Sequence, residues 1–172
     1  LLNEVIDSIR QDNPEMALKL YLNAALQANL IITDSARFEE VSASFLNTAI
    51  TIYQETANTN QNKINLLREI CGVLLKITLI NKERLVQLIP QLHQSAGTMQ
   101  KRNDQCIGML YLSDLYYMLF DEKKKVIDSL KKAKRYADFS MTNASNLYLF
   151  VIILNKAIYF IEKGMKGIVS LI

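Results

Sequence analysis

Residues 13 to 29, NPEMALKLYLNAALQAN, carry the pattern that decides the fold. Asn13 can cap the free N–H groups of a helix start, and Pro14 at the first helical position loses no hydrogen bond. Polar side chains then recur every fourth residue as one narrow strip, at Glu15, Lys19, Asn23 and Gln27. Almost everything between them is Leu, Ala, Met or Tyr, so we predict a helix from Pro14 to about Asn29 that is contacted on most sides.

The next segment has a different, one-sided pattern. It is predicted to run as a helix from a cap at Asp34 to about Glu55. One face is apolar, with Phe38, Val41, Phe45, Ala49, Ile52 and Tyr53. The opposite face carries Glu40, Ser44, Asn47 and Thr51 and is expected to meet water or a partner.

The alternation of a heavily apolar helix with a one-sided helix then repeats. After the polar stretch 56–61, a third helix is predicted through Leu79, and Asn81 caps a fourth helix that ends near Ser95 to Gly97. Pro90 lies inside this fourth helix and is expected to kink or break it. Three further helices are predicted, from Asn103 or Asp104 to Phe120, from Asp121 to about Phe139, and from Asn143 to about Lys163.

The spacing of these helices predicts an all-α fold. The first helices of successive pairs begin near Pro14, Gln61, Asp104 and Asn143, roughly 40 to 47 residues apart, as in helix-pair repeats of the HEAT or armadillo type. Only 5 Gly and 2 Pro occur in 172 residues, too few to punctuate a sheet. We therefore expect one α-solenoid domain over residues 1–172, with about seven long antiparallel helices. Because the chain starts at Leu1 without Met, we interpret it as a fragment of a longer one.

Catalytic and cofactor signatures are missing from the sequence. No G-x-G-x-x-G, G-x-x-x-x-G-K-[ST], H-E-x-x-H or C-x-x-C motif occurs. His93 is the single histidine and is expected to be structural or solvent-facing. Cys71 and Cys106 are expected to be buried free thiols, which fits a reducing compartment. We expect no enzyme activity, metal or cofactor, although helical folds can host sites that no short motif reveals.

Three surface features are relevant to partners. Asp114 lies in an apolar stretch and must reach a hydrogen-bond partner or face outward. The segment Lys123 to Arg135 places basic side chains opposite Val126 and Leu130, which is most often a solvated face. In the last helix Tyr148, Ile152 and Tyr159 lie on the polar arc, where they either pack on a further repeat or bind a protein.

Several ordered segments resemble one family, the large α-solenoid subunit of retromer (vacuolar protein sorting-associated protein 35), specifically its C-terminal half. The matching segments are LKLYLNAAL (18–26), FEEVSASFLNTAITIYQE (38–55), NDQC (103–106), VIDSLKKAKRYA (126–137) and LFVIILNKAIYFIEK (149–163). The polar linker 56–61 and Asn103 depart from the family pattern, which tends to an acidic linker and a Pro.

The resemblance implies a non-enzymatic scaffold of a cytoplasmic coat, peripheral on endosomal membranes. Such a coat retrieves transmembrane cargo from endosomes to the trans-Golgi network or the plasma membrane. It also implies that this part binds the small metallophosphoesterase-like retromer subunit, while other subunits bind the missing N-terminal half. Self-contact in the coat is expected near Lys101 and Arg102. From helical facing, our candidates for the partner-binding wall are Arg37, Glu40, Ser44, Asp128, Lys132, Arg135, Tyr148, Ile152 and Asn155.

One alternative of a different class stays open. A generic helical-repeat adaptor could bind acidic membrane or nucleic acid through the Lys123 to Arg135 face. The net charge of +3 and the pI near 8.8 give this alternative only weak support. Tyr136 is the one aromatic ring on that face, so base stacking is not favoured. The leading expectation assigns no nucleic acid to the chain.

Overall fold

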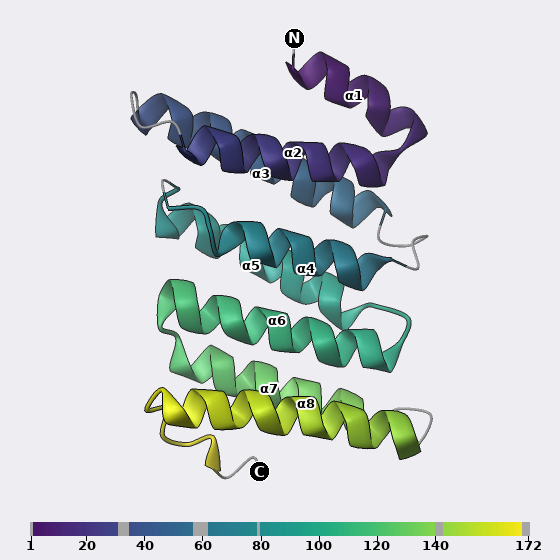
Figure 1. Cartoon of the computed structure of the whole chain (residues 1–172), viewed down its shortest axis with the longest axis vertical. Coiled ribbons are helices and arrows are strands. Elements are labelled where there is room, and N and C mark those ends of the chain that lie inside the picture. Colours follow the sequence, from purple (N-terminus) through teal and green to yellow (C-terminus); the bar gives the residue numbers. More distant parts are fainter. Residues whose placement is uncertain (1, 31–34, 57–61, 79, 140–142, 170–172) are drawn as a thin grey trace. The chain divides into compact units, whose positions relative to one another are not determined.

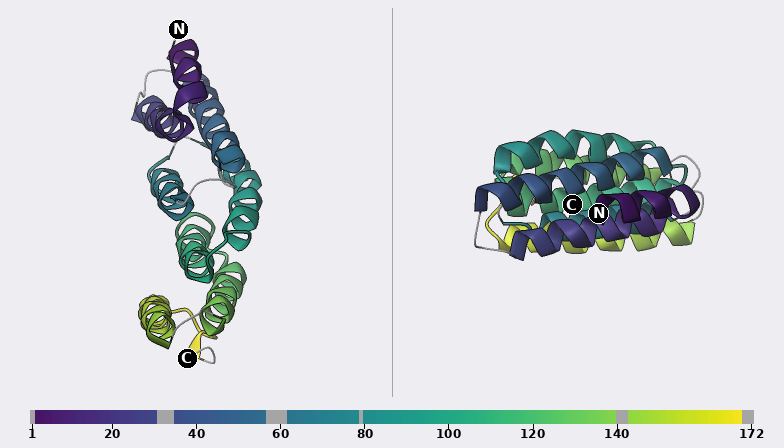
Figure 2. Two further views of the ribbon diagram at one scale, coloured as in Figure 1. Left: turned by 90° about the vertical axis from the view of Figure 1, so that its right-hand side faces the viewer. Right: turned by 90° about the horizontal axis from the view of Figure 1, so that it is seen from above.

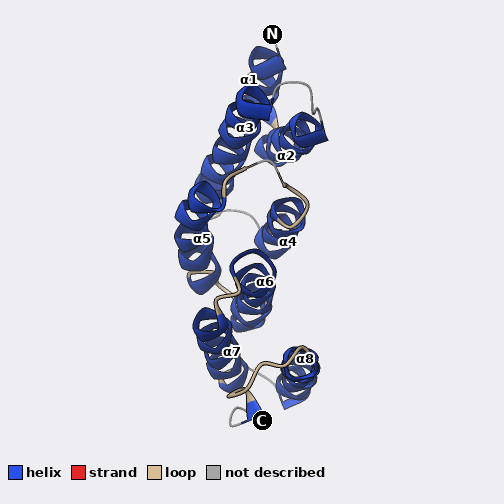
Figure 3. Cartoon of the chain, turned by 90° about the vertical axis from the view of Figure 1, so that its left-hand side faces the viewer, coloured by secondary structure: helices blue, strands red, loops and turns tan. Residues whose placement is uncertain are grey.

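A computed structural model describes residues 2–30, 35–56, 62–78, 80–139 and 143–169. The regular elements in these ranges are all helices, with no strand (Figure 3). Contacts within the chain divide it into two units, Leu1–Ser95 and Ala96–Ile172. In each unit the helices pack in adjacent pairs, which confirms the predicted all-α solenoid class.

The first unit contains four helices and a fifth whose last two residues belong to the second unit (Figure 1). They are α1 (Leu2–Asp12), α2 (Pro14–Leu30), α3 (Ser35–Thr56), α4 (Lys63–Leu74) and α5 (Lys82–Gly97). Helices α2 and α3 pack along one another, α1 and α4 both contact α2, and α4 also touches α3. Figure 2 shows α2 and α4 in one row of this unit and α3 and α5 in the other.

Side-chain caps account for two of the helix starts, as the sequence predicts. The Met16 amide donates to Asn13 Oδ1 at 3.0 Å, at the start of α2. The Glu83 amide donates to Asn81 Oδ1 at 3.0 Å, at the start of α5. Each bond satisfies an N–H that lacks a partner within its own helix. The cap predicted at Asp34 lies outside the described residues.

The structure corrects the sequence analysis at α1 and at the end of α4. Helix α1, not predicted from the sequence, is held by Ile6, which is 3% exposed, and by a 2.8 Å hydrogen bond from the Tyr21 hydroxyl to Asp7. Helix α4 ends at Leu74 rather than continuing to Leu79. Beyond it the Thr78 amide donates to Asn29 Oδ1 of α2 at 2.8 Å, a tertiary bond that replaces a helical one.

Pro90 neither breaks nor ends its helix. Helix α5 continues from Lys82 to Gly97 with Pro90 in its interior, on the exposed side. A proline ring removes one helical hydrogen bond, and the carbonyl that loses its partner can be solvated where the residue faces water. Leu85, Ile89 and Leu92 are each at most 2% exposed on the opposite side, so packing holds the helix together.

The second unit contains α6 (Arg102–Phe120), α7 (Lys123–Asp138) and α8 (Asn143–Glu162). Helix α7 packs closely on α6, and α8 contacts both (Figure 2). Asp121 does not begin α7 as predicted. It adopts the left-handed conformation with φ of 50° and caps the C-terminus of α6, where its amide donates to the Tyr117 carbonyl at 3.3 Å. Such a residue terminates one helix before the next can begin.

An ion pair joins α6 to α8 and provides the partner for the Asp114 carboxylate. Lys156 Nζ lies 2.8 Å from both carboxylate oxygens of Asp114. Both side chains are 26% exposed, so the pair is partly buried. Asp114 therefore satisfies its charge with a partner, one of the two outcomes that the sequence allowed.

Candidate partner-binding surfaces

The α3 face carries the first group of predicted contact residues. Arg37, Glu40 and Ser44 are all exposed, and Asn47 continues the same line along the helix. The opposite side of α3 is closed by Leu46, Ile50 and Tyr53, each at most 1% exposed. Residues three or four apart share one helical face, so the polar line is displayed where a partner can reach it.

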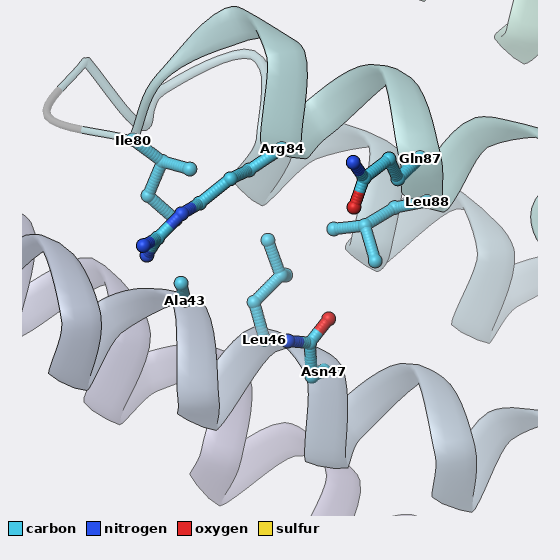
Figure 4. Close-up of a pocket in the computed structure, with 7 residues that line it drawn as sticks. All are labelled: Ala43, Leu46, Asn47, Ile80, Arg84, Gln87 and Leu88. Carbon is cyan, nitrogen blue, oxygen red and sulfur yellow. The ribbon is translucent and has the colours of Figure 1, made fainter.

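A pocket opens where this polar line approaches α5. It has a volume of about 190 Å³ and is lined from α3 by Ala43, Leu46 and Asn47, and from α5 and the residue before its cap by Ile80, Arg84, Gln87 and Leu88. Figure 4 shows Arg84 extending toward Ile80 and Ala43 at one end, while the Gln87 and Asn47 amides lie at the other. The sequence analysis missed Arg84 and Gln87, because nothing in a one-helix pattern indicates which neighbour a polar side chain will face.

A second hollow in the first unit is apolar. It has a volume of about 540 Å³ and lies between α1, α2 and α3, with Val5, Ile6, Leu20, Phe38 and Phe45 among its lining residues. Prediction could not find it from the sequence because one of its walls is the unpredicted helix α1.

Helix α7 carries the second predicted group. Asp128, Lys132 and Arg135 are exposed, while Val126, Leu130 and Ala133 on the inner side are at most 2% exposed. The wider basic face is exposed too, at Lys123, Lys124, Lys125 and Lys131. Part of its charge is already used, since Lys125 Nζ lies 2.8 Å from Glu122 and 5.5 Å from the centre of the Tyr116 ring.

Helix α8 carries the third predicted group. Tyr148 is 62% exposed, Asn155 is exposed and Ile152 is half-buried. The sequence analysis placed Tyr148, Ile152 and Tyr159 on this side of the helix but missed how many other apolar residues it carries. Five further large apolar side chains are exposed along it, namely Leu147, Val151, Leu154, Ile158 and Tyr159. They recur at three- and four-residue intervals, so they form one continuous stripe with Tyr148.

The structure groups these residues by unit. Arg37, Glu40 and Ser44 belong to the first unit, whereas the α7 and α8 groups both belong to the second. A single wall made from all nine residues stays a prediction.

The two residues predicted for coat self-contact lie at the start of α6. Lys101 is exposed at the helix N-cap position. Arg102 is exposed too, but its Nη1 donates to Gln105 Oε1 at 2.8 Å and its guanidinium lies 5.7 Å from the centre of the Tyr136 ring. Arg102 is therefore oriented by its own unit, and Lys101 is the freer of the two to contact another molecule.

Reactive groups in the described residues are buried or dispersed. Cys71 and Cys106 are free and buried, as predicted, and burial raises the pKa of the Cys106 thiol to about 12. His93 is half-buried on α5. In the described ranges, no three His, Cys, Asp or Glu side chains gather as they would around a metal ion. Among the helices of these ranges, none combines the length and the apolar character needed to cross a membrane.

Paired helices with exposed side faces, as found in each unit, are typical of a helical-repeat protein. The family model for "Vacuolar protein sorting-associated protein 35" matches residues 1–171. The chain belongs to this family, which confirms the resemblance seen in the sequence.

Curated relatives agree with this assignment. Vacuolar protein sorting-associated protein 35C of Arabidopsis thaliana is 29% identical over 98% of this chain and 22% of its own length. Vacuolar protein sorting-associated protein 35 of Schizosaccharomyces pombe is 27% identical over 92% of this chain and 19% of its own length. Vacuolar protein sorting-associated protein 35B of Arabidopsis thaliana is 28% identical over 95% of this chain and 22% of its own length. The chain thus spans about a fifth of the length of these relatives.

Proposed function

We propose that this chain is a non-enzymatic scaffold segment of the retromer coat, one that binds the small metallophosphoesterase-fold subunit during retrieval of transmembrane cargo. The observation that carries the proposal is the family match, which extends over residues 1–171. The accessible features of the described residues support it, since they are helix faces suited to protein contacts.

The α8 stripe supports the proposal most directly. Large apolar side chains that recur at helical intervals and stay exposed mark a surface that a partner covers. Tyr148 is the strongest single candidate because an aromatic ring with a polar tip is the type of residue that dominates contact energies. Ile152 and Asn155 lie about one and two turns further along the same helix.

Co-purification with the small retromer subunit tests the proposal. We expect stoichiometric capture by the folded chain at micromolar concentrations. Tyr148→Glu should weaken capture at least tenfold, because it places a charge within the apolar stripe. Met118→Glu is the matched control: Met118 is 61% exposed in the same unit but lies on α6. Failure of the correctly folded chain to capture the subunit would refute the proposal.

The proposal also states where the protein acts and how it assembles. A scaffold of this kind would be cytoplasmic and peripheral on endosomal membranes, and other retromer subunits would bind parts of the protein outside this chain. Self-association through Lys101 and Arg102 predicts a concentration-dependent dimer in sedimentation, weakened by Lys101→Glu. An unchanged sedimentation profile in that variant would remove these residues from the contact.

The exposed basic face of α7 favours a second candidate, an adaptor that binds acidic membrane or nucleic acid. Lys131, Lys132 and Arg135 are exposed together on one side of that helix. Binding to anionic liposomes or RNA that disappears when all three become Glu, with the fold intact, would favour it. Capture of the small subunit that persists in the same variant would favour the scaffold.

A further inference from the structure

We infer that the pocket between α3 and α5 receives a glutamate side chain from a partner protein, with Arg84 as the residue that binds its carboxylate. The inference rests on the proposed function only in taking the chain to be a protein-binding scaffold. Beyond that function, it names the side chain that one contact point of the scaffold would select.

The polar side chains that line the pocket have unused hydrogen-bonding groups. Arg84 lines the pocket from the first turn of α5. Within the described residues its guanidinium has no hydrogen bond or ion pair, and the side-chain amides of Asn47 and Gln87 have none either. Three polar groups that face one small pocket without partners leave donors and acceptors for an incoming ligand.

The charge of the pocket decides the ligand type. Arg84 contributes the single charged side chain among the lining residues. Two acids lie near this end of α5 but do not line the pocket: Glu39 accepts a 3.1 Å hydrogen bond from the Asn81 amide at the helix start, and Glu83 is exposed beside Arg84. A guanidinium beside neutral amides matches a carboxylate, which it can bind through two parallel N–H groups.

Size and shape favour a side chain over a free metabolite. At about 190 Å³ the pocket is below the roughly 300 to 1,000 Å³ of sites for drug-sized ligands or cofactors. In Figure 4 the Leu46 side chain lies between the Arg84 end and the amide end. A glutamate could place its carboxylate at Arg84, its methylenes over Leu46 and its peptide groups at Asn47 and Gln87. A lone anion would use the Arg84 end alone.

The experiment is an NMR titration of the isotope-labelled chain. The probe is the peptide acetyl-Gly-Gly-Glu-Gly-Gly-amide, and its counterpart carries Gln in place of Glu. We expect the Glu peptide to shift the side-chain amide signals of Asn47 and Gln87 with a dissociation constant on the order of 1 mM, as suits one contact point. The Gln peptide should bind about tenfold more weakly, because it loses the charge-assisted bond.

Variants separate the pocket from general charge effects. Arg84→Met should weaken the Glu peptide about tenfold, and Arg84→Lys should fall between the two because it keeps the charge but loses the two-pronged geometry. Lys82→Met is the control: it removes the same charge from an exposed position on the same helix, outside the pocket. Arg84 is exposed and lacks a partner among the described residues, so thermal unfolding of the chain should not change.

Three results would overturn the inference. They are equal binding of the Glu and Gln peptides, full binding by Arg84→Met, and absence of signal changes at about 20 mM peptide, well above the expected constant. Acetate that shifts the same amide signals as strongly as the peptide would identify a simple anion site instead. Capture of the small subunit is measured separately, so failure of the pocket and failure of the scaffold proposal give different results.

Discussion

Removing the ion pair between Asp114 and Lys156 should loosen α8 from α6. The pair is the one salt bridge between these two helices in the described part of the second unit. Its geometry is symmetrical, with Nζ 2.8 Å from both carboxylate oxygens. Lys156 Nζ also lies 5.7 Å from the centre of the Tyr159 ring, which orients the ammonium from a second side.

The magnitude follows from burial. Exposed pairs contribute roughly 0–1 kcal/mol, and breaking a fully buried pair costs roughly 3–5 kcal/mol because one charge loses its partner. Both side chains here are 26% exposed, which places them between these limits. We therefore expect Asp114→Asn and Lys156→Met each to lower the free energy of unfolding by about 2 kcal/mol. The double variant should lose less than the sum, with a coupling energy of about 1–2 kcal/mol.

Urea unfolding of the four proteins, followed by circular dichroism at pH 7, measures this coupling. The exposed pair Glu122 and Lys125 serves as a control in the same unit, with an expected coupling of about 0.3–0.5 kcal/mol. Raising the salt to about 1 M should reduce the control coupling more than that of Asp114 and Lys156, because partly buried charges are screened less. A coupling below about 0.5 kcal/mol for Asp114 and Lys156 would refute the reasoning.

Three further predictions concern single side chains. Burial lowers the pKa of Lys63, 8% exposed and 5.9 Å from the Tyr53 ring centre, so Lys63→Met should raise stability by about 1 kcal/mol at pH 7. Because the native state disfavours the protonated form of Lys63, wild-type stability should rise with pH toward the unfolded pKa near 10.4, and it should rise more than that of the variant. Equal urea midpoints of the wild type and the variant at pH 7 would contradict this prediction. Cys106, with its pKa raised to about 12, should resist an aromatic disulfide reagent at pH 8 until urea unfolds the chain, and rapid native labelling would contradict its burial. Asn13→Ala should cost about 1 kcal/mol in thermal unfolding through the lost cap, whereas Asn23→Ala on the exposed face of the same helix should cost nothing.

The sequence predicted helix starts well where a single capping residue determines them. Asn13 with Pro14 marks the start of α2, and Asn81 marks the start of α5, because a cap depends only on the adjacent amides. Prediction was wrong where tertiary contacts decide. Residues 75–79 are apolar enough to extend α4, but the Asn29 side chain of another helix binds the Thr78 amide instead.

In the candidate sites, too, the sequence predicts what one helix determines and misses what depends on the packing of two helices. Exposure of Arg37, Glu40 and Ser44 follows from helical periodicity, because the opposite side of α3 is mostly apolar and buried. The pocket beside them could not be predicted, since Arg84 is about 40 residues away and reaches α3 only after two helices pack. Likewise, Leu147 and Val151 look like core residues in sequence, and only the packed unit shows that they are exposed.

The two kinds of surface would contribute differently to binding. The α8 stripe offers large apolar area, and burying it supplies affinity with little selectivity, because the hydrophobic effect is non-directional. The α3 and α5 pocket offers the reverse: one guanidinium and two amides contribute little net energy with the correct ligand, but a wrong ligand that covers them leaves them unpaired. Variants on α8 should therefore change the strength of capture for any partner of that face, whereas Arg84 variants should change which sequences are accepted. That contrast can be measured as a ratio of Glu-peptide to Gln-peptide binding, which α8 variants should leave unchanged.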